Sequence, residues 1–214
     1  MPLHKVIFLA NNTKLYLWKI TEDLVELSKE VLLKDSSIVR LEGMKSENHK
    51  KGFLAVRKLL QHIDYNDFDL YYDAFGKPHI KPQGCSIKDI HISISHSHAF
   101  SALAVSDKNV GLDIEILKPK ILKIAPRFMN ISHLENTPDE EKIEKATVVW
   151  GIKESIFKIK NEVGISFMDH IFEESFRIED KRTIAKLNFN NKEELFNIQF
   201  DSVEAYIFVC AFEN

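Results

Sequence analysis

Cysteine is scarce in this sequence: there are two copies, Cys85 and Cys210, far apart along the chain. Two such residues do not make a disulfide framework, so we expect two free thiols in a reducing cytoplasm. Glycine, with 7 copies, and proline, with 6, are also few, and no long flexible linker is expected. A chain of 214 residues then forms one large domain or two small lobes.

Long apolar runs and an excess of charge of one sign are missing as well. No stretch approaches the roughly 18 apolar residues of a membrane-spanning helix. The first residues, MPLHKVIFLANNTK, hold an apolar hexamer too short for a signal-peptide core and lack a small-residue cleavage site. The formal net charge of −3 gives no pull toward nucleic acid or anionic membrane. We therefore expect a cytoplasmic protein that binds neither membrane nor nucleic acid.

What the sequence does contain is enough apolar material for a core, at 44% hydrophobic residues, arranged as both strands and helices. The expected helices are 21–33, with Thr21 as N-cap, 46–63, with a basic first turn, and two pieces between 118 and 160 that break near Thr137-Pro138. The expected strands are 4–10, 14–20, a strand–turn–strand at 69–80, two strands within 90–106 around a loop at 95–99, 110–116, 176–190, 194–201 and 204–212. Strand, helix and strand follow one another in both halves, which suggests two lobes.

The strand VGLDIEI, residues 110–116, raises the first question of chemistry. Alternation places Asp113 and Glu115 on one face and apolar side chains on the other. One interpretation is an ordinary strand face in contact with water. The other is a clamp for a hard cation such as Mg²⁺ or Mn²⁺, because two carboxylates on one face repel each other unless a cation lies between them.

A helix over 147–160 offers a third carboxylate. At about 100° per residue, the apolar arc consists of Val148, Ile152, Ile156 and Ile159, and the opposite arc consists of Trp150, Lys153, Glu154 and Lys158. The simplest interpretation is a solvated helix with a Glu154–Lys158 pair at i,i+4 spacing. If the helix packs across the strand, Glu154 instead adds a metal ligand to Asp113 and Glu115.

Histidines and basic residues complete the candidates. Ser95 and His96 stand at a strand end in ISISHSH, either as hydrogen-bonded turn residues or exposed to a ligand. His91, His96 and His98 match no strong zinc spacing and have no cysteine nearby. The remaining candidates are basic side chains that are ordinary surface residues singly and phosphate ligands together: Lys50, Lys51, Arg57, Lys158 and Lys77, the last in a rigid Gly-Lys-Pro turn.

Four segments in order, FGKPHI, HISISHS, VGLDIE and WGIKESIFK, resemble the motifs of the 4′-phosphopantetheinyl transferases of the Sfp-like class. They run from Gly76 to Lys158, and the upstream KKGFLAVRKLL resembles the family's basic segment. The resemblance implies two similar α+β lobes in one chain, here 1–105 and 106–214, related by a pseudo-twofold with coenzyme A between them. It also implies a reaction: the phosphopantetheine arm of coenzyme A moves to a serine of an apo carrier protein, with Mg²⁺, and 3′,5′-ADP leaves.

The resemblance also implies roles for the candidates. Asp113, Glu115 and Glu154 would hold the metal, and Lys158 would bind a pyrophosphate oxygen. Glu154 is the best candidate for the base that activates the serine, and a metal-bound water is equally consistent with the sequence. Glu154, Lys158 and Asp113 thus form the expected catalytic set. The residues expected to contact coenzyme A itself are Ser95 and His96 at its phosphates, and Lys77, Arg57 and Lys50 or Lys51 on the 3′-phosphate and adenine side.

Three positions depart from the family pattern: Ser93 replaces an asparagine, His133 stands where a glutamate is usual, and Gly52 stands where relatives often have glutamate. Ser93 and His133 keep open a non-catalytic relative that binds coenzyme A or a carrier, and an unrelated Mg²⁺-dependent nucleotide phosphohydrolase is a further alternative. The expected partner is an acidic carrier protein of fatty-acid, polyketide, nonribosomal-peptide or lysine synthesis, and the chain is expected to be a monomer. The expected docking segment, ILKPKILKIAPRFMN, interleaves Lys118, Lys120, Lys123 and Arg127 with Ile121, Ile124 and Phe128; the alternative is a packed helix with solvated lysines.

Overall fold

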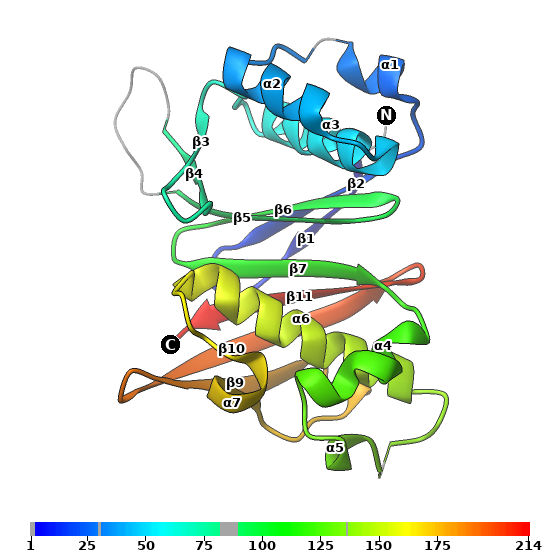
Figure 1. Cartoon of the computed structure of the whole chain (residues 1–214), viewed down its shortest axis with the longest axis vertical. Coiled ribbons are helices and arrows are strands. Elements are labelled where there is room, and N and C mark those ends of the chain that lie inside the picture. Colours follow the sequence, from blue (N-terminus) through cyan, green and yellow to red (C-terminus); the bar gives the residue numbers. More distant parts are fainter. Residues whose placement is uncertain (1–2, 30, 82–89, 136) are drawn as a thin grey trace. The chain divides into compact units, whose positions relative to one another are not determined.

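The computed structural model describes residues 3–29, 31–81, 90–135 and 137–214. It divides into two compact units, Met1–Lys108 and Asn109–Asn214, called here the N-terminal and the C-terminal unit. Each combines an antiparallel sheet with helices (Figure 1), so the mixed α and β content expected from the sequence is confirmed. The lobe boundary at 105–106 and the pseudo-twofold between the lobes stay predictions, and Cys85 lies outside the described residues.

The N-terminal unit is built on a four-stranded sheet in the order β1-β2-β6-β5. Helix α3 (Glu47–His62) packs on β2, β5 and β6 through leucines such as Leu54, Leu59 and Leu60, which are fully buried. A separate hairpin carries the Gly-Lys-Pro turn. The other elements of this unit are β1 (Leu3–Phe8), β2 (Lys14–Lys19), α1 (Leu24–Ser28), α2 (Asp35–Gly43), β3 (Leu70–Tyr72), β4 (Pro78–Ile80), β5 (His91–Ser97) and β6 (Phe100–Ser106).

The start of α1 differs from the expectation. Asp23, not Thr21, is the N-cap: its side chain accepts a hydrogen bond from the Glu26 N–H at 2.8 Å, and Glu26 Oε2 accepts one from the Asp23 N–H at 3.3 Å. This reciprocal capping box satisfies two backbone donors at once, which a lone threonine two residues earlier does not. The helix also ends at Ser28, earlier than predicted, and α2 was not predicted at all.

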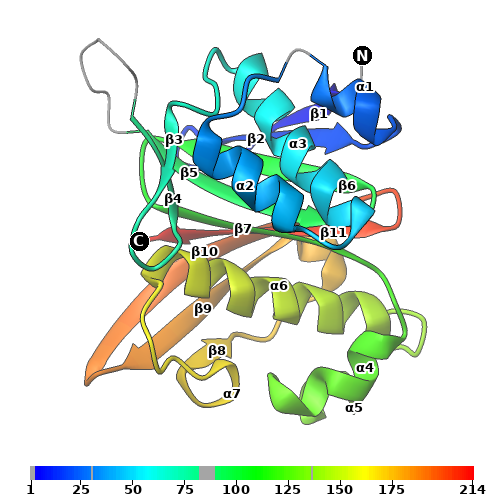
Figure 2. The same cartoon turned by 45° about the horizontal axis from the view of Figure 1, so that its top comes forward.

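The C-terminal unit is built on a five-stranded antiparallel sheet in the order β7-β11-β10-β9-β8. The long helix α6 (Lys142–Lys160) packs on β7 and β11, and α4 and α5 also contact it, as Figure 2 shows. The strands are β7 (Val110–Ile116), β8 (Ile171–Glu173), β9 (Arg182–Phe189), β10 (Lys192–Val203) and β11 (Tyr206–Glu213); the shorter helices are α4 (Lys120–Ile124), η1 (Ala125–Arg127), α5 (Ser132–Glu135), α7 (Phe167–His170) and η2 (Ile178–Asp180).

Helix α6 is covered on more than one side, which the sequence did not indicate. Buried residues occur all around it, from Ala146 to Ile159. The predicted division into one apolar arc and one arc presented to solvent is therefore wrong for Lys153, which is buried. Of the described residues, no helix is both long and apolar enough to cross a membrane.

Candidate functional site

The candidate site begins where α6 crosses β7, and a glycine makes that crossing possible. Gly111 belongs to the same strand face as Asp113 and Glu115. A Cβ atom on Gly111 would lie 1.8 Å from the carbonyl oxygen of Ser155 on α6, which is far inside contact distance. Only glycine allows the helix backbone to come this close to the strand. The two carboxylates therefore stand on the strand face that α6 covers.

Asp113 is not a solvent-exposed strand residue. It is buried, with 5% of its surface exposed, and its Oδ1 accepts a hydrogen bond from Lys158 Nζ at 2.9 Å. The same ammonium donates to the Leu112 carbonyl oxygen at 2.7 Å. A buried carboxylate costs free energy unless it is paired, so Lys158 neutralises Asp113 in this structure. The interpretation of 110–116 as an ordinary solvated strand is wrong.

Glu154 and Glu115 bring two further negative charges near this pair. Burial raises the pKa of Glu154, the carboxylates of Asp113 and Glu115 raise it further, and Lys158 acts in the opposite direction. The three carboxylates thus interact electrostatically, as the sequence predicted for one strand and one packed helix. Three acidic groups with one ammonium leave a net negative charge, which favours a cation.

The donor chemistry of this cluster fits Mg²⁺. Among the described residues, no group of three or more His, Cys, Asp or Glu side chains forms a preformed metal cage. Mg²⁺ does not require one, because it keeps several waters and is held by one or two carboxylates together with substrate phosphates. Nor do His91, His96 and His98 form such a group in the part of the chain that the structure describes. Asp113, Glu115 and Glu154 remain the candidate ligands.

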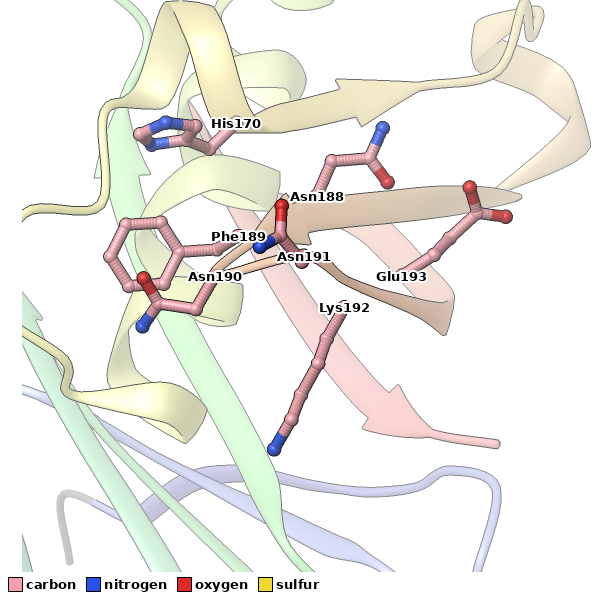
Figure 3. A pocket seen from close by; sticks show the side chains of 7 residues that line it. All are labelled: His170, Asn188, Phe189, Asn190, Asn191, Lys192 and Glu193. Carbon is pink, nitrogen blue, oxygen red and sulfur yellow. The ribbon is translucent and has the colours of Figure 1, made fainter.

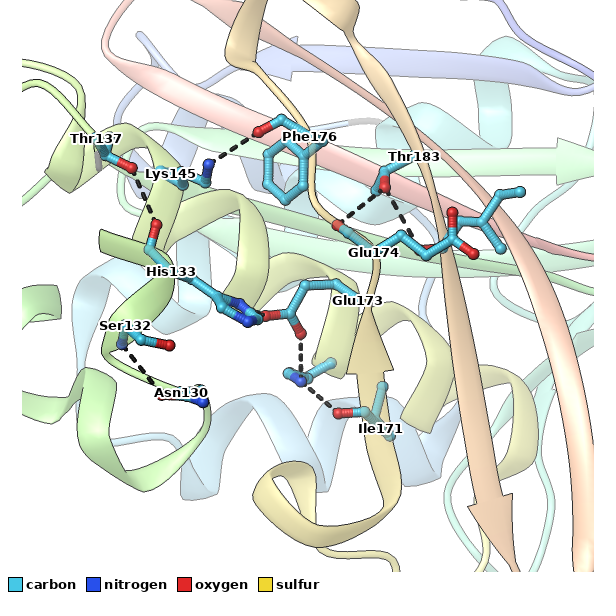
Figure 4. A network of polar contacts seen from close by, with 12 residues as sticks. Asn130, Ser132, His133, Thr137, Lys145, Ile171, Glu173, Glu174, Phe176 and Thr183 are labelled. Carbon is cyan, nitrogen blue, oxygen red and sulfur yellow. Dashed lines mark hydrogen bonds and ion pairs between the residues drawn. The ribbon is translucent and has the colours of Figure 1, made fainter. Parts of the chain in front are cut away.

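Lys153 faces away from this cluster, into a buried polar network. Its Nζ lies 2.6 Å from Glu173 Oε2 on β8 and also donates to the Ile171 carbonyl oxygen. The other oxygen of Glu173 lies 2.9 Å from His133 Nδ1 on α5, and Figure 4 shows these two side chains pointing toward one another. Burial lowers the pKa of Lys153, and the neighbouring Glu173 opposes this. His133 and Lys153 therefore brace α5, β8 and α6.

Trp150 also has a packing role. Its ring makes edge contacts with Phe128 at 5.1 Å and with Phe167 at 5.6 Å, measured between ring centroids. Phe128 itself is 1% exposed. Phe128 therefore belongs to the core and is not part of an exposed apolar centre of the docking segment, contrary to the expectation. Lys120, Lys123 and Arg127 of that segment are exposed as predicted.

In the N-terminal unit, Ser95 and His96 are neighbours on β5, so their side chains leave opposite faces of the sheet. Ser95 is buried, with 9% of its surface exposed, and His96 is exposed. The sequence placed both at one strand end without distinguishing the two faces. His96 is the more accessible of the two to a ligand.

Arg57 is buried rather than presented to a ligand. Its Nε donates to Asp67 Oδ1 at 2.9 Å, its Nη1 donates to the Phe53 carbonyl oxygen at 3.3 Å, and its guanidinium lies 3.4 Å from the centre of the Phe53 ring. The side chain is only 3% exposed. These contacts give Arg57 a structural role in anchoring α3 in place of the ligand role predicted from the sequence.

The other basic candidates are more accessible. Lys51 pairs with Glu47 at 3.1 Å, and Lys50 is half-buried in the same turn of α3. The turn that carries Lys77 is rigid as predicted: Asp73 Oδ1 accepts from the Lys77 N–H at 2.9 Å, and Gly76 has φ +84°. His79 and the Lys77 backbone N–H lower the pKa of the Asp73 carboxyl, so it stays ionised as the acceptor that fixes the turn.

An open pocket of about 410 Å³ lies elsewhere, around the β9–β10 turn and His170 (Figure 3). Its lining includes Asn188, Asn190 and Lys192, and none of the predicted site residues. Asn190 and Asn191 both have positive φ, as a tight hairpin turn requires. The hollow is accounted for by the shape of this turn.

Gly111 at the candidate site and Glu173 in the polar network around Lys153 were not predicted from the sequence. Gly111 had a signal, because an isolated glycine inside a strand marks a close backbone approach. Glu173 had none: it lies 20 residues after its partner Lys153, and only the fold brings the two together.

Comparison with known proteins points to one family. Residues 109–210 match the model of the 4′-phosphopantetheinyl transferase superfamily. A 4′-phosphopantetheinyl transferase of Bacillus subtilis is 31% identical over 141 residues, which cover 64% of this chain and 60% of the relative. The 4′-phosphopantetheinyl transferase Sfp of Bacillus subtilis is 30% identical over 113 residues, 50% of this chain and 49% of the relative.

A third relative, the 4′-phosphopantetheinyl transferase gsp of Aneurinibacillus migulanus, is 29% identical over 149 residues, 67% of this chain and 58% of the relative. The chain thus spans about half to three fifths of the length of these relatives. The resemblance indicated by the four motifs is confirmed, and the matched segment holds Asp113, Glu115, Glu154 and Lys158.

Proposed function

We propose that this chain is a 4′-phosphopantetheinyl transferase that moves the phosphopantetheine arm of coenzyme A to a serine of an apo carrier protein. The observation that carries the proposal is the contact of α6 with β7, where Lys158 donates to Asp113 and Glu154 interacts electrostatically with Asp113. This contact lies wholly inside the segment that matches the family model. Three carboxylates and one ammonium in a partly buried site suit a doubly charged cation with a phosphate-bearing substrate.

Asp113, Glu115 and Glu154 are the metal ligands in this proposal. Mg²⁺, or Mn²⁺ in its place, neutralises the charge of the coenzyme A pyrophosphate when it is bound. Burial, followed by repulsion from Asp113 and Glu115, raises the pKa of Glu154, and a bound cation would relieve that repulsion. The carboxylates need no preformed cage, because substrate oxygens and water would supply the remaining ligands.

Lys158 has two partners in turn. In this structure its ammonium neutralises Asp113. With a cation held by that carboxylate, the Lys158 ammonium would remain beside the site and would bind a pyrophosphate oxygen of the substrate or of the leaving group. A lysine suits this exchange because its flexible stem lets the point charge move a short distance.

The reaction needs a base and a leaving group. The serine oxygen of the carrier forms a bond to the phosphorus that bears the pantetheine arm, and the bond from that phosphorus to the bridging oxygen breaks. 3′,5′-ADP leaves with the electron pair of the broken bond, and Glu154 accepts the serine proton. A carboxylate held in a partly buried site is a stronger base than one in water, which suits this role.

The N-terminal unit contributes the ligands for the rest of coenzyme A. We assign Lys77, Ser95, His96 and Lys50 or Lys51 to its phosphates and adenine side. Lys77 is held by a turn that Asp73 fixes through two contacts, to the Phe75 and Lys77 backbone N–H groups. Because the turn backbone is already fixed, less conformational entropy is lost when Lys77 binds a phosphate.

An acidic carrier protein is the proposed partner, and its proposed docking surface is the basic segment around α4. Lys120, Lys123 and Arg127 are exposed there, and Ile131, 40% exposed, supplies apolar surface beside them in place of the buried Phe128. Basic residues around an apolar contact favour an acidic amphipathic helix. The protein acts as a monomer in this proposal.

One incubation tests the proposal. The protein is mixed with coenzyme A, Mg²⁺ and an apo acyl carrier protein or an apo peptidyl carrier domain, and the carrier is weighed by mass spectrometry. Gain of one phosphopantetheine arm supports the transferase. No gain together with tight coenzyme A binding identifies a non-catalytic relative, and phosphate release without any carrier identifies a phosphohydrolase.

A further inference from the structure

His96 lies on the face of β5 that meets α3. Ile94 and Ile92 occupy the same face two and four residues earlier; Ile92 belongs to the apolar core that α3 covers, and Ile94 packs against that core. At the end of the strand this row of side chains leaves the core, and His96 becomes exposed. The imidazole is therefore placed at the rim of the contact between α3 and the sheet.

Gly52 on α3 provides the surface on which this imidazole rests. A Cβ atom on Gly52 would lie 3.1 Å from His96 Cδ2 and 3.2 Å from His96 Cγ. The ring thus packs directly on the helix backbone, where no other side chain intervenes. Ser101 Oγ of β6 donates to the Gly52 carbonyl oxygen at 3.2 Å, which ties the helix to the sheet at this residue. The close packing of the His96 ring therefore explains why position 52 holds a glycine.

His49 flanks the same ring. It stands three residues before Gly52 on α3, on the same side of the helix. The rings of His49 and His96 stack, with centroids 5.8 Å apart and an angle of 30° between their planes. His49 is exposed, as His96 is, so the pair lies at the surface. The resemblance to known families assigns no role to His49.

We propose that His49 is a positioning residue for His96: it stacks on the imidazole and, with Gly52, holds it in the orientation in which it receives a phosphate group of coenzyme A. This inference rests on the proposed function, which assigns His96 to those phosphates. An exposed imidazole turns about two side-chain bonds, and binding must stop that rotation. The Gly52 surface on one side and the His49 ring on another restrict it before the ligand arrives, which lowers the cost of binding.

Binding of 3′,5′-ADP, followed by titration calorimetry, tests the inference with a ligand that undergoes no transfer. We expect His49→Ala to weaken binding about 3- to 10-fold, the factor that an aromatic pair contributes. His49→Phe keeps a stacking ring without nitrogen atoms and restores the affinity to within about 2-fold. In transfer assays His49→Ala raises the KM for coenzyme A and leaves kcat nearly unchanged, because the proposed role of His96 is to bind a phosphate and not to transfer the serine proton.

The matched control is His62→Ala, at the other end of the same helix, where His62 makes an edge contact with Tyr16 at 5.9 Å. It leaves the affinity unchanged. Equal loss in His49→Phe and His49→Ala means that His49 binds the phosphate through its nitrogen atoms, and it overturns the positioning role. No loss in either variant also overturns it.

A wild-type protein that binds neither coenzyme A nor 3′,5′-ADP contradicts the proposed function instead. The stack itself is then read from the NMR resonance of the His96 ring protons. These shift in His49→Ala and stay near their original position in His49→Phe if the ring of residue 49 holds His96. Unchanged resonances in both variants overturn the inference without reference to any ligand.

Discussion

Lys158 Nζ and Asp113 Oδ1 lie 2.9 Å apart where helix α6 crosses strand β7. The carboxylate side chain is 6% exposed and the lysine side chain is 28% exposed, so the pair is buried on the strand side and open on the helix side. A substrate or cation that approaches from the open side meets the ammonium first. We therefore expect occupancy of the proposed site to change the stability of the C-terminal unit.

Lys158→Met removes an ammonium that donates a hydrogen bond to Asp113 Oδ1. We expect the free energy of unfolding to fall by about 1–3 kcal/mol, because a buried carboxylate loses its counter-charge. We also expect Mg²⁺ to raise the melting temperature of this variant more than that of the wild type, since the cation replaces the ammonium. Thermal melts with and without Mg²⁺ measure both effects.

Lys160→Met is the matched control for that experiment. Lys160 lies two residues after Lys158 on the same helix, and it pairs with Glu194 at 2.8 Å and not with a candidate metal ligand. Its melting temperature gains no more from Mg²⁺ than that of the wild type. A Lys158→Met protein whose melting temperature ignores Mg²⁺ argues against Asp113 as a ligand.

Gly111→Ala places a methyl group 1.8 Å from the Ser155 carbonyl oxygen, so α6 and β7 must move apart. Overpacking of this kind costs about 1–3 kcal/mol and here falls at the upper end or beyond, because the clash is with backbone. The separation also removes Lys158 from Asp113, so transfer activity is lost in the fraction that stays folded. Urea unfolding followed by circular dichroism gives the change in stability.

Gly43→Ala serves as the comparison, since a Cβ atom at Gly43 meets nothing within 4 Å. We expect this variant to differ from the wild type by no more than about 0.5 kcal/mol. Equal effects of the two substitutions are the outcome that speaks against a tight α6–β7 crossing.

The buried pair of Lys153 and Glu173 predicts strong non-additivity. Glu173→Gln or Lys153→Met alone leaves one charge uncompensated in the interior, at a cost of about 3–5 kcal/mol. The double variant removes both charges and recovers much of that loss. A double-mutant cycle on unfolding free energies measures the coupling, and simple addition of the two single effects contradicts the network.

Glu154 gives the site a pH dependence of definite sign. Its pKa is raised above the ordinary value of 4.5, chiefly by burial and then by Asp113, so the folded protein holds this proton more tightly than the unfolded chain. That contribution to stability is fully present below pH 4.5 and is lost as the pH rises through the raised pKa. Glu154→Gln removes the dependence, so its stability relative to the wild type increases with pH across this window.

Urea unfolding of both proteins at several pH values, without divalent cations, measures the difference. Adding Mg²⁺ at neutral pH stabilises the wild type and leaves Glu154→Gln less affected, because the variant lacks one carboxylate. A stability difference that stays constant with pH means that the pKa of Glu154 is not raised in the folded protein.

Local sequence patterns were sufficient to predict features that depend on a single helix or strand. The alternation in VGLDIEI predicted β7 with the observed bounds Val110–Ile116, and the apolar spacing in 46–63 predicted α3 at Glu47–His62. Asp113 and Glu115 were placed on one face for the same reason. These features depend on backbone periodicity, which one segment of sequence carries by itself.

Long-range partners were the part that the sequence could not supply. Lys153 was assigned to an open face, because a helical wheel does not reveal that β8 and α5 cover the second side of α6. Arg57 was assigned to a ligand, because its partner Asp67 lies in a segment without any pattern of its own. In both cases the basic residue pairs with a buried acidic residue that comes from another part of the fold.

The most direct test of the proposed function compares the wild type with Asp113→Asn, which keeps the shape of the side chain and removes its charge. Each is incubated with coenzyme A, Mg²⁺ and an apo carrier protein, and the intact mass of the carrier is followed with time. We expect the wild type to add one phosphopantetheine arm and Asp113→Asn, although folded by circular dichroism, to be slower by at least about 100-fold. A folded Asp113→Asn protein that modifies the carrier at the wild-type rate would contradict the assignment of the active site to the crossing of α6 and β7.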